Sequence, residues 1–427
     1  MNPLVDKMTS FIVMDVLERA NELQRQGVDI IHLEVGEPDF DVPECVSEAV
    51  VDAYKNHQTH YTHSLGDPEL RQEIANLYKR EYNVNVSPDQ ILVTSGSSPA
   101  ILLTMLLLCH TQSEVILSNP GYACYKNFVL GAHATPVFVP LNAENGFQYK
   151  VEDIQNKITP NTAAIFINSP MNPTGTVLQP EFMQQVAQLG VPVISDEIYH
   201  GLVYESKAHS ILEYTDNAFV LNGFSKRFAM TGLRLGYLIA PKQYMPALQK
   251  LAQNFLICAS STAQKAGIAA LRDTSDYGKI MFDTYNERRL YLLKRLRNMG
   301  FTIPVDPQGA FYVFVDASKY TNNSLQFAFD VLEKAHVGIT PGVDFGTGGE
   351  GFVRFSYANS LENIKEGMDR LENYLQSLRD GESTNRLIGE STLFGPWACR
   401  RARMDGDAVR RWGGFLSANR GIDEFCE

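Results

Sequence analysis

The sequence predicts an α/β protein, in which a large domain with a mostly parallel, seven-stranded sheet flanked by helices is joined to a smaller α+β domain. Short runs rich in aliphatic and β-branched residues alternate with helical stretches between about residues 90 and 240. These runs are apolar throughout, as is typical of parallel strands buried on both faces. After about residue 245, helices and strands follow one another in mixed order, which indicates the second, α+β domain.

The N-terminal residues carry a helical pattern. In the first 24 residues the apolar positions follow helical spacing with Glu18 and Arg19 between them, and there is no long apolar stretch of the kind found in signal peptides. We expect four segments. Residues 1–40 join the small domain, 41–285 form the large domain, 286–380 form the small domain, and 381–427 form a tail of a different kind.

The strands of the large domain can be read from the apolar runs, each followed by a helix or a turn. The run Ala100–Cys109 is the longest, but it is about half the roughly 20 residues that a membrane helix needs. We therefore predict a buried helix there and no membrane association. The predicted strands are Gln90–Thr94, Glu114–Ser118, Thr135–Val139, Ala163–Ile167, Val191–Ile194, Phe219–Leu221 and Leu235–Ile239.

The small domain follows a helical region near residues 245–299. Two of its predicted strands, Phe301–Ile303 and Ala310–Val315, precede a predicted helix over Leu325–Lys334. A further strand, Phe352–Ser356, leads into a helix over Leu361–Leu378.

The tail beyond residue 380 differs in composition from the rest of the chain. It holds both tryptophans, seven arginines and no lysine, and it lacks sustained periodicity. We interpret it as an appended or disordered tail without a part in the chemistry. The alternative is a partner-binding extension.

The composition of the chain limits the kinds of ligand that it is expected to bind. The formal net charge of -12 argues against a general nucleic-acid binder, so small molecules are the expected ligands. The six cysteines form no CxxC pair and give no zinc-ligand spacing, so we expect no metal. Scattered cysteines without a disulfide framework are typical of reduced thiols in a cytoplasmic protein.

Polar side chains follow three predicted strands where each strand ends. Asn172 lies in the turn after one strand, Asp196 and Tyr199 follow the next, and Ser225 with Lys226 follow a third. Ligands of open α/β sheets gather at the carboxyl ends of the strands. Asp196 alone could merely cap the following helix, but three such strand ends together predict a site.

Lys226 has the character of a Schiff-base lysine. A buried ammonium group loses hydration, so its pKa falls and its lone pair becomes free to condense with an aldehyde. A surface lysine is the alternative for an isolated Ser-Lys pair.

A phosphate-sized anion has two candidate contacts. Ser97 and Ser98 open the buried helix after Gly96, and the free amides of a helix start bind anions. Arg234, eight residues after Lys226, is the natural counter-charge. An ordinary serine-capped helix is the alternative.

Two further residues are candidates. Tyr122 follows another strand and brings an aromatic face to the same sheet edge, unless it only packs. Arg354 stands between Val353 and Phe355 in a predicted strand. A buried arginine needs an anion, and its planar fork suits a carboxylate. The alternative is that Arg354 lies on the outward face of the strand, where water hydrates the guanidinium and no anion is needed.

The stretch from Gly346 to Gly351 satisfies G-x-G-x-x-G but is rejected as a nicotinamide site. It enters a strand, whereas the dinucleotide motif follows a strand and opens a helix.

Together these segments resemble the fold-type-I, pyridoxal-phosphate-dependent aminotransferases of class I/II. The likeness covers roughly residues 10–380. It is carried most specifically by Ser225-Lys226 through Arg234-Leu-Gly236, with support from Gly36-Glu-Pro-Asp-Phe40, the segment from Tyr61 to Arg71, and Asn172-Pro-Thr-Gly175.

The resemblance implies an amino acid:2-oxo acid aminotransferase, with pyridoxal 5'-phosphate as cofactor and a ping-pong mechanism. Lys226 would form the Schiff base and move a proton between the substrate α-carbon and the cofactor, and Asp196 would keep the pyridine nitrogen protonated. Tyr199 and Asn172 would bond the ring oxygen, and Tyr122 would stack on the ring.

The remaining implied roles concern the phosphate and the substrate. A homodimer with shared active sites is implied, because Tyr61 would come from the neighbouring subunit. The phosphate would contact Ser97, Ser98, Ser225, Arg234 and that Tyr61, while Arg354, Gly36 and Asn172 would hold the substrate carboxylate.

The sequence allows more than one amino acid substrate and more than one type of reaction. The apolar segment from Ser10 to Val13 lies where family members often close over the substrate side chain, which favours neutral or aromatic amino acids. Aspartate or glutamate as the substrate is the alternative. A cysteine β-lyase on the same fold is the alternative reaction, and a non-catalytic regulator would usually need an attached DNA-binding module.

Overall fold

The central element is a seven-stranded sheet with the strand order β2-β8-β7-β6-β5-β3-β4. The structure, a computed structural model, describes residues 3–390. All neighbouring strands pair in parallel except β8, which runs antiparallel to β2 and β7. The strands are β2 (Ile91–Thr94), β3 (Glu114–Asn119), β4 (Thr135–Pro140), β5 (Thr162–Asn168), β6 (Val193–Asp196), β7 (Ala218–Gly223) and β8 (Gly236–Ile239).

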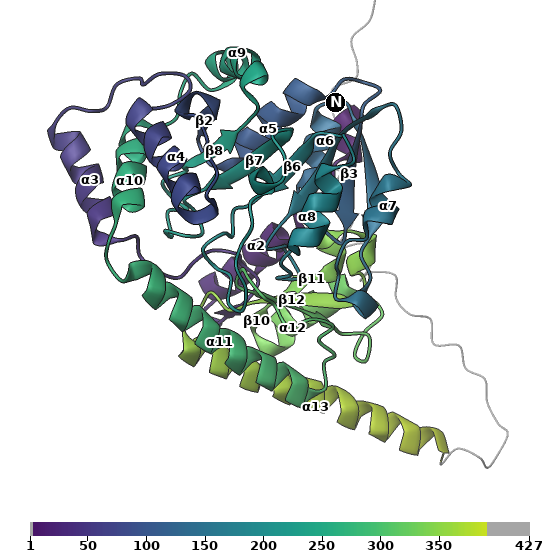
Figure 1. Cartoon of the computed structure of the whole chain (residues 1–427). Coiled ribbons are helices and arrows are strands. Elements are labelled where there is room, and N and C mark those ends of the chain that lie inside the picture. The colour runs from purple at the N-terminus through teal and green to yellow at the C-terminus, as the bar shows by residue number, and fades with distance from the viewer. Residues whose placement is uncertain (1–2, 391–427) are drawn as a thin grey trace, which may run out of the picture. The chain divides into compact units, whose positions relative to one another are not determined.

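The sheet is buried on both faces, as its apolar strands predict. In β3, Ile116 packs on one side with Leu70 and Ile74, whereas Val115 and Leu117 pack on the other side. Helices cover both faces (Figure 1), so alternate side chains of one strand enter two different cores. The predicted fold class and all seven predicted strands are confirmed, with ends within two residues of those expected.

The buried apolar run forms helix α5, which packs against β7 and β8. Its apolar residues surround the helix axis, and Ile101, Leu103 and Met105 are at most 2% exposed. The helices are α1 (Pro3–Lys7), α2 (Ile12–Arg25), α3 (Glu44–Lys55), α4 (Pro68–Tyr82), α5 (Ser97–Leu108), α6 (Tyr125–Gly131), α7 (Val151–Gln155), α8 (Pro180–Ala187), α9 (Met245–Phe255), α10 (Ser261–Arg272), α11 (Tyr277–Met299), α12 (Ser324–Ala335) and α13 (Leu361–Glu390).

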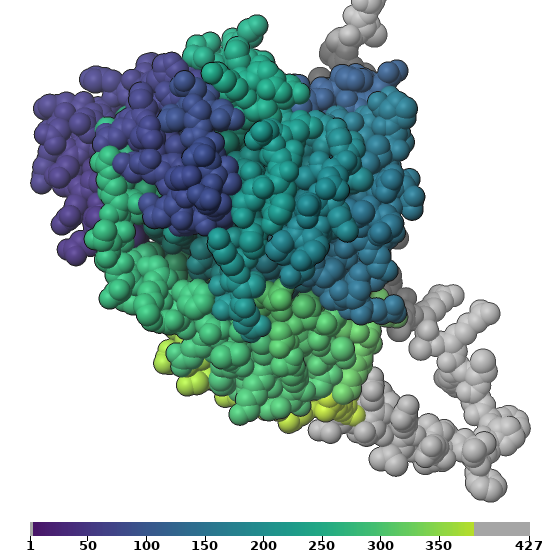
Figure 2. Space-filling view, in the orientation of Figure 1, coloured from purple at the N-terminus to yellow at the C-terminus, as the bar shows by residue number. Residues whose placement is uncertain are grey.

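Two small sheets lie beside the large one. The first is antiparallel, with the order β11-β12-β9, and consists of β11 (Thr340–Pro341), β12 (Phe352–Ser356) and β9 (Tyr312–Asp316). In the second, β1 (Ile31–His32) pairs in parallel with β10 (Val337–Gly338), which brings the N-terminal residues to this part of the chain. In the space-filling view the green residues of this region lie directly against the teal residues of the large sheet (Figure 2).

The predicted strand Phe301–Ile303 is wrong. Only an isolated bridge between Thr302 and Asp316 forms there. Gly300, in the left-handed conformation at φ 95°, ends α11 just before this segment. Pro304 follows it, and a proline cannot donate to a strand ladder, so the pairing stops.

Helix α11 runs beside the first turns of α13 (Figure 1), joined where Arg295 of α11 contacts Asp369 at 2.7 Å and Glu372 at 3.0 Å. Helix α13 continues past its predicted end at Leu378 to Glu390. Residues up to Gln376 form one compact unit, whose limit falls within α13. The rest of the predicted tail, residues 391–427, lies outside the described residues. No helix among the described residues is long and apolar enough to cross a membrane.

Candidate active site

A cavity of about 320 Å³ opens at the carboxyl edge of the large sheet. Its walls come from the sheet, from the start of α2 and from the antiparallel sheet with β12. Eleven residues predicted from the sequence line it together: Gly36, Ser97, Ser98, Tyr122, Asn172, Asp196, Tyr199, Ser225, Lys226, Arg234 and Arg354.

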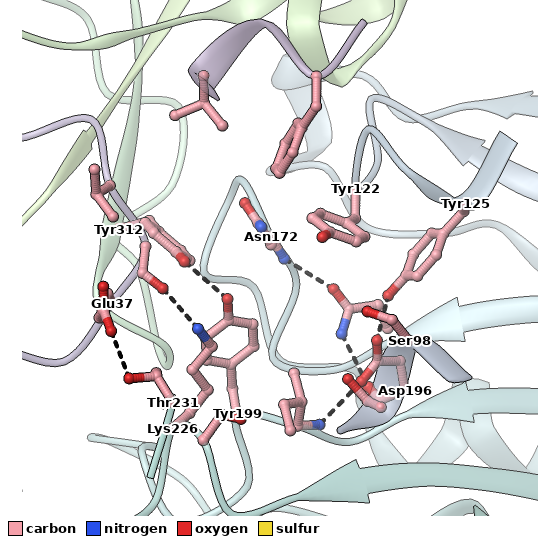
Figure 3. A pocket seen from close by; sticks show the side chains of 18 of the residues that line it. Glu37, Ser98, Tyr122, Tyr125, Asn172, Asp196, Tyr199, Lys226, Thr231 and Tyr312 are labelled. Carbon is pink, nitrogen blue, oxygen red and sulfur yellow. Dashed lines mark hydrogen bonds between the residues drawn. The ribbon is translucent and has the colours of Figure 1, made fainter. Parts of the chain in front are cut away.

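Asp196 occupies the floor of this cavity. It is the last residue of β6, in register with Asn168 at the end of β5, and its side chain is buried. The Tyr125 hydroxyl donates to Asp196 Oδ2 at 2.7 Å (Figure 3). The Ile198 amide donates to Oδ1 at 3.1 Å. Burial raises the pKa of Asp196 to about 6, and these two hydrogen bonds oppose the rise. The pocket floor therefore carries a buried carboxyl group that is mostly ionised at neutral pH and can pair with a cationic group of a ligand.

Lys226 lies above the end of β7, within the same cavity. Its Nζ donates to the carbonyl oxygen of Gly36 at 2.6 Å. Loss of hydration lowers the pKa of Lys226 to about 8, and the nearby cations Arg354 and Arg234 lower it further, while Glu37 opposes the shift. A lysine with such a pKa is a better nucleophile and proton acceptor near neutral pH than an exposed one.

Arg354 is buried, at 3% exposed, in β12. Its guanidinium donates to Asn172 Oδ1 at 2.8 Å and to the Glu34 carbonyl at 2.6 Å. It lies over the Tyr312 ring at 4.2 Å. Its Nε has no hydrogen-bond partner, and no carboxylate among the described residues forms an ion pair with it.

The environment of Arg354 excludes the outward-facing alternative. Burial of a cation is costly, because it removes hydration that only an anion replaces well. The Asp344 carboxylate interacts electrostatically with Arg354, but the hydrogen bonds of the guanidinium go to neutral acceptors and leave Nε without a partner. The arrangement therefore fits a carboxylate-bearing ligand entering the cavity.

The start of α5 and Arg234, the two predicted contacts for an anion, line the same cavity. No side chain caps α5, so the first amides of the helix, at Ser97 and Ser98, have no side-chain acceptor. Gly96 precedes them at φ 93°, and a Cβ built there would lie 2.6 Å from Arg234 Nη2. The absence of a side chain at Gly96 thus lets the guanidinium approach the helix start.

Aromatic side chains form the remaining walls. The Tyr199 and Tyr312 hydroxyls are 2.8 Å apart (Figure 3), and burial holds the pKa of Tyr199 well above its usual value. Tyr122 meets Phe11 edge to face, with ring centroids 5.8 Å apart. Tyr122 and Tyr199 therefore both reach the cavity, as predicted.

Tyr61 does not reach this cavity. Its side chain is 80% exposed, so the structure separates it from the other predicted site residues. Conversely, Tyr125 and Tyr312 belong to the site although neither received a role from the sequence. Tyr125 stands three residues after Tyr122 in the same turn, which was the only available signal.

The described residues hold no group of three or more histidine, cysteine or acidic side chains that could bind a metal ion. Cys45, Cys109, Cys124 and Cys258 are free thiols.

The matching family model and two similar relatives are all described as aminotransferases or transaminases. The family model described as aminotransferase class I and II matches residues 28–371. The (5-formylfuran-3-yl)methyl phosphate transaminase of Methanocaldococcus jannaschii is 39% identical over 371 residues, which cover 86% of this chain and 97% of that protein. The aspartate aminotransferase of Pyrococcus horikoshii is 37% identical over 372 residues, covering 85% and 94%.

A solved structure agrees with these sequences. The aspartate aminotransferase from Thermus thermophilus with maleate superposes with a TM-score of 0.84 at 35% identity, covering 87% of this chain and 99% of that chain. The family match includes the cavity residues from Gly36 to Arg354.

Proposed function

Because this chain belongs to the class I and II aminotransferases, we propose that its cavity holds pyridoxal 5'-phosphate on Lys226. The chain is an amino acid:2-oxo acid aminotransferase, and the transaminase names of its relatives decide against the lyase alternative. The observation that carries the proposal is that Lys226, whose pKa is lowered, lines one cavity together with the buried carboxyl of Asp196 and the guanidinium of Arg354.

The residues present fit this cofactor. When bound, it supplies an aldehyde that takes up the amino group and a ring that draws electrons from the substrate α-carbon. Asp196 would pair with the ring nitrogen, Tyr199 and Asn172 would donate to the ring oxygen, and Tyr122 would cover one face of the ring. The phosphate would lie in the cradle of Ser97, Ser98, Ser225 and Arg234, where the missing Cβ of Gly96 leaves room for the guanidinium.

Arg354 would bind the α-carboxylate of both the donor and the acceptor. Asn172, which already accepts from Arg354 at 2.8 Å, and the backbone of Gly36 complete this contact. A fixed carboxylate orients the α-carbon toward Lys226. Once displaced from the cofactor, the Lys226 amine would take the proton from the donor's α-carbon and deliver it to the cofactor carbon that carried the aldehyde, and the same transfer would run in reverse for the acceptor. Since one site serves both substrates, we propose a ping-pong order.

The proposed biological unit is a homodimer in which Tyr61 of the partner subunit completes the phosphate cradle. Tyr61, Phe255 and Ile257 are large apolar residues that are 80%, 62% and 52% exposed. A hydrogen bond joins the loop that contains Tyr61 to α10, in which the Gln264 side chain donates to the Thr62 hydroxyl at 2.9 Å. A partner subunit that covers these residues would explain their exposure. We also propose a cytoplasmic location, which free thiols favour.

We propose a neutral or aromatic side chain for the amino donor. Among the described residues, the cations that line the cavity are Lys226, Arg234 and Arg354, and each has a role above. The part of the wall formed by Phe11 and Val13 is apolar. Relatives named for aspartate and for a furan phosphate differ in substrate, so the family does not decide this point.

The attachment point can be tested with Lys226→Ala. The parent chain with added cofactor should absorb visible light, and borohydride should fix the cofactor to the peptide that contains Lys226. Lys226→Ala should lose both signals and at least about 100-fold in turnover, the scale of a lost general acid–base group. Lys242→Ala, a change of an exposed lysine in the same chain, should match the parent. Borohydride labelling that persists in Lys226→Ala would place the attachment elsewhere.

A further inference from the structure

Residues 9–13, here called the strap, form part of the wall of the active-site cavity. Phe11 and Val13 line the cavity. The Phe11 ring meets Tyr122 nearly at right angles, at 87°. The strap therefore presents Phe11 beside the aromatic face proposed to cover the cofactor.

Asp344 anchors the strap at its C-terminal end. Helix α2 begins at Ile12, and its N-cap residue is Phe11, which has no side-chain oxygen to accept from the free amides. The Asp344 carboxylate takes this place from far along the chain. Its Oδ1 accepts from the Ile12 amide at 2.9 Å, and its Oδ2 accepts from the Val13 amide at 3.3 Å. Asp344 is 7% exposed, so water competes little for these bonds.

Asn127 of α6 anchors the other end. Its Oδ1 accepts from the Thr9 amide at 3.3 Å, and its Nδ2 donates to the Thr9 carbonyl at 3.0 Å. The two anchors belong to different sides of the site. Helix α6 begins with Tyr125, which bonds Asp196, whereas Asp344 precedes Phe345, whose ring lies 5.0 Å from the Arg354 guanidinium.

Packing alone does not fix the strap. A second cavity, of about 170 Å³, is lined by strap residues Thr9, Ser10 and Ile12 together with Val343 and Phe138. A segment with empty space beside it can shift toward that space unless directional bonds hold it. The Ser10 hydroxyl donates to Asp15 Oδ2, in the first turn of α2, at 2.6 Å, and the hydrogen bonds of Asp344 and Asn127 tie the strap to the rest of the site.

We infer that Asp344 and Asn127 are positioning residues that hold Phe11 against Tyr122 and thereby set the preference for the side chain of the amino donor. The inference rests on the proposed function, because it assigns the space under Phe11 to that side chain. Because Asp344 and Asn127 already hold the strap in place, substrate binding does not have to supply the entropy cost of ordering it. A donor with a large apolar side chain gains from a fixed Phe11, whereas alanine is too short to reach it.

The test compares Asp344→Ala and Asn127→Ala with Phe11→Ala, which removes the ring itself. The control is Asp52→Ala, which deletes a carboxylate that is 68% exposed on α3. With phenylalanine as donor, KM should rise about fivefold to tenfold in the three strap variants, the size of effect expected from a lost cap or aromatic contact. With alanine, KM should change by less than about twofold in Asp344→Ala and Asn127→Ala, and in these two variants kcat should stay near that of the parent for both donors. Asp344→Asn, which keeps one acceptor oxygen, should lie between Asp344→Ala and the parent.

Hydrogen–deuterium exchange of the chain without added cofactor gives a second readout. The amides of Ile12 and Val13 should exchange faster in Asp344→Ala than in the parent and in Asp52→Ala. Unchanged exchange and an unchanged KM for phenylalanine would overturn the inference. An equal loss of kcat with both donors would overturn it too, since Asp344 would then act on Arg354 rather than on the strap. If the parent itself fails to bind the cofactor, the proposed function is wrong, whereas the exchange result still reports on the anchors.

Discussion

At the scale of single residues, Lys226 should react at a pH where other lysines are protonated. Its pKa is lowered from 10.5 to about 8 by loss of hydration. The neutral amine is the nucleophile, so its fraction rises steeply with pH below about 8, is about one half near pH 8 and levels off above about pH 9. The rate at which the unloaded chain condenses with pyridoxal 5'-phosphate, followed by stopped-flow absorbance, should therefore rise about tenfold per pH unit below about 8 and level off above. A rate that keeps climbing to pH 10 would contradict the lowered pKa.

The residues of the site differ in how far the sequence predicts them. Lys226, Asp196 and Arg354 stand out because a charged residue in or beside an apolar strand needs a reason to be buried. Tyr125 and Tyr312 do not, because tyrosine packs well in any core. The contact between Tyr125 and Asp196 joins residues 71 positions apart and exists only after folding. The proposed roles of the individual site residues remain predictions that the variants above test.

At the scale of elements, the junction of β2 and α5 should depend on Gly96. Alanine at this position must adopt φ 93° and would bring a Cβ within 2.6 Å of Arg234 Nη2. We expect Gly96→Ala to weaken the binding of pyridoxal 5'-phosphate by about tenfold or more, because strain of about 1–3 kcal/mol falls on the phosphate cradle. Fluorescence titration of the unloaded chain with the cofactor measures this change.

Gly190→Ala is the matched control for this prediction. Gly190 also has a positive φ, of 76°, but a Cβ there would meet nothing within 4 Å. The control variant should melt at a lower temperature, because it carries the backbone strain, and should bind cofactor as the parent does. If Gly96→Ala also kept the parent affinity, the cradle would have to lie elsewhere.

Strands that form a continuous apolar run could be predicted from the sequence, whereas strands of only two residues could not. The seven strands of the large sheet are continuous apolar runs, and their order in the chain leads to one mostly parallel sheet. The strand β1 has only two residues and pairs with β10 across the chain, so no local pattern marks it. The domain limits at residues 40, 285 and 380 remain predictions.

At the scale of the whole molecule, the proposed homodimer predicts complementation between two impaired variants. Tyr61→Ala should bind the cofactor phosphate more weakly, by about 1.5–3 kcal/mol for a lost hydrogen bond to a charged group, and Lys226→Ala should lack turnover. In a mixed dimer, the subunit that retains Lys226 receives an intact Tyr61 from its partner subunit. Mixed dimers purified through two different tags should therefore regain part of the parent turnover at low cofactor concentration. Mixed dimers no better than Tyr61→Ala would show that Tyr61 does not cross between subunits.

The contact between Arg354 and the Glu34 carbonyl has a consequence for protein synthesis. The two residues are 320 positions apart. At roughly 5–20 residues per second, the ribosome needs roughly 16–64 s to make that length of chain. Lys226 is made well before this interval ends, whereas the arginine that would grip a substrate is made only at its end. On the proposed function, a ribosome-stalled or truncated product that ends before Arg354 would therefore be inert toward amino acids, although it already contains Lys226.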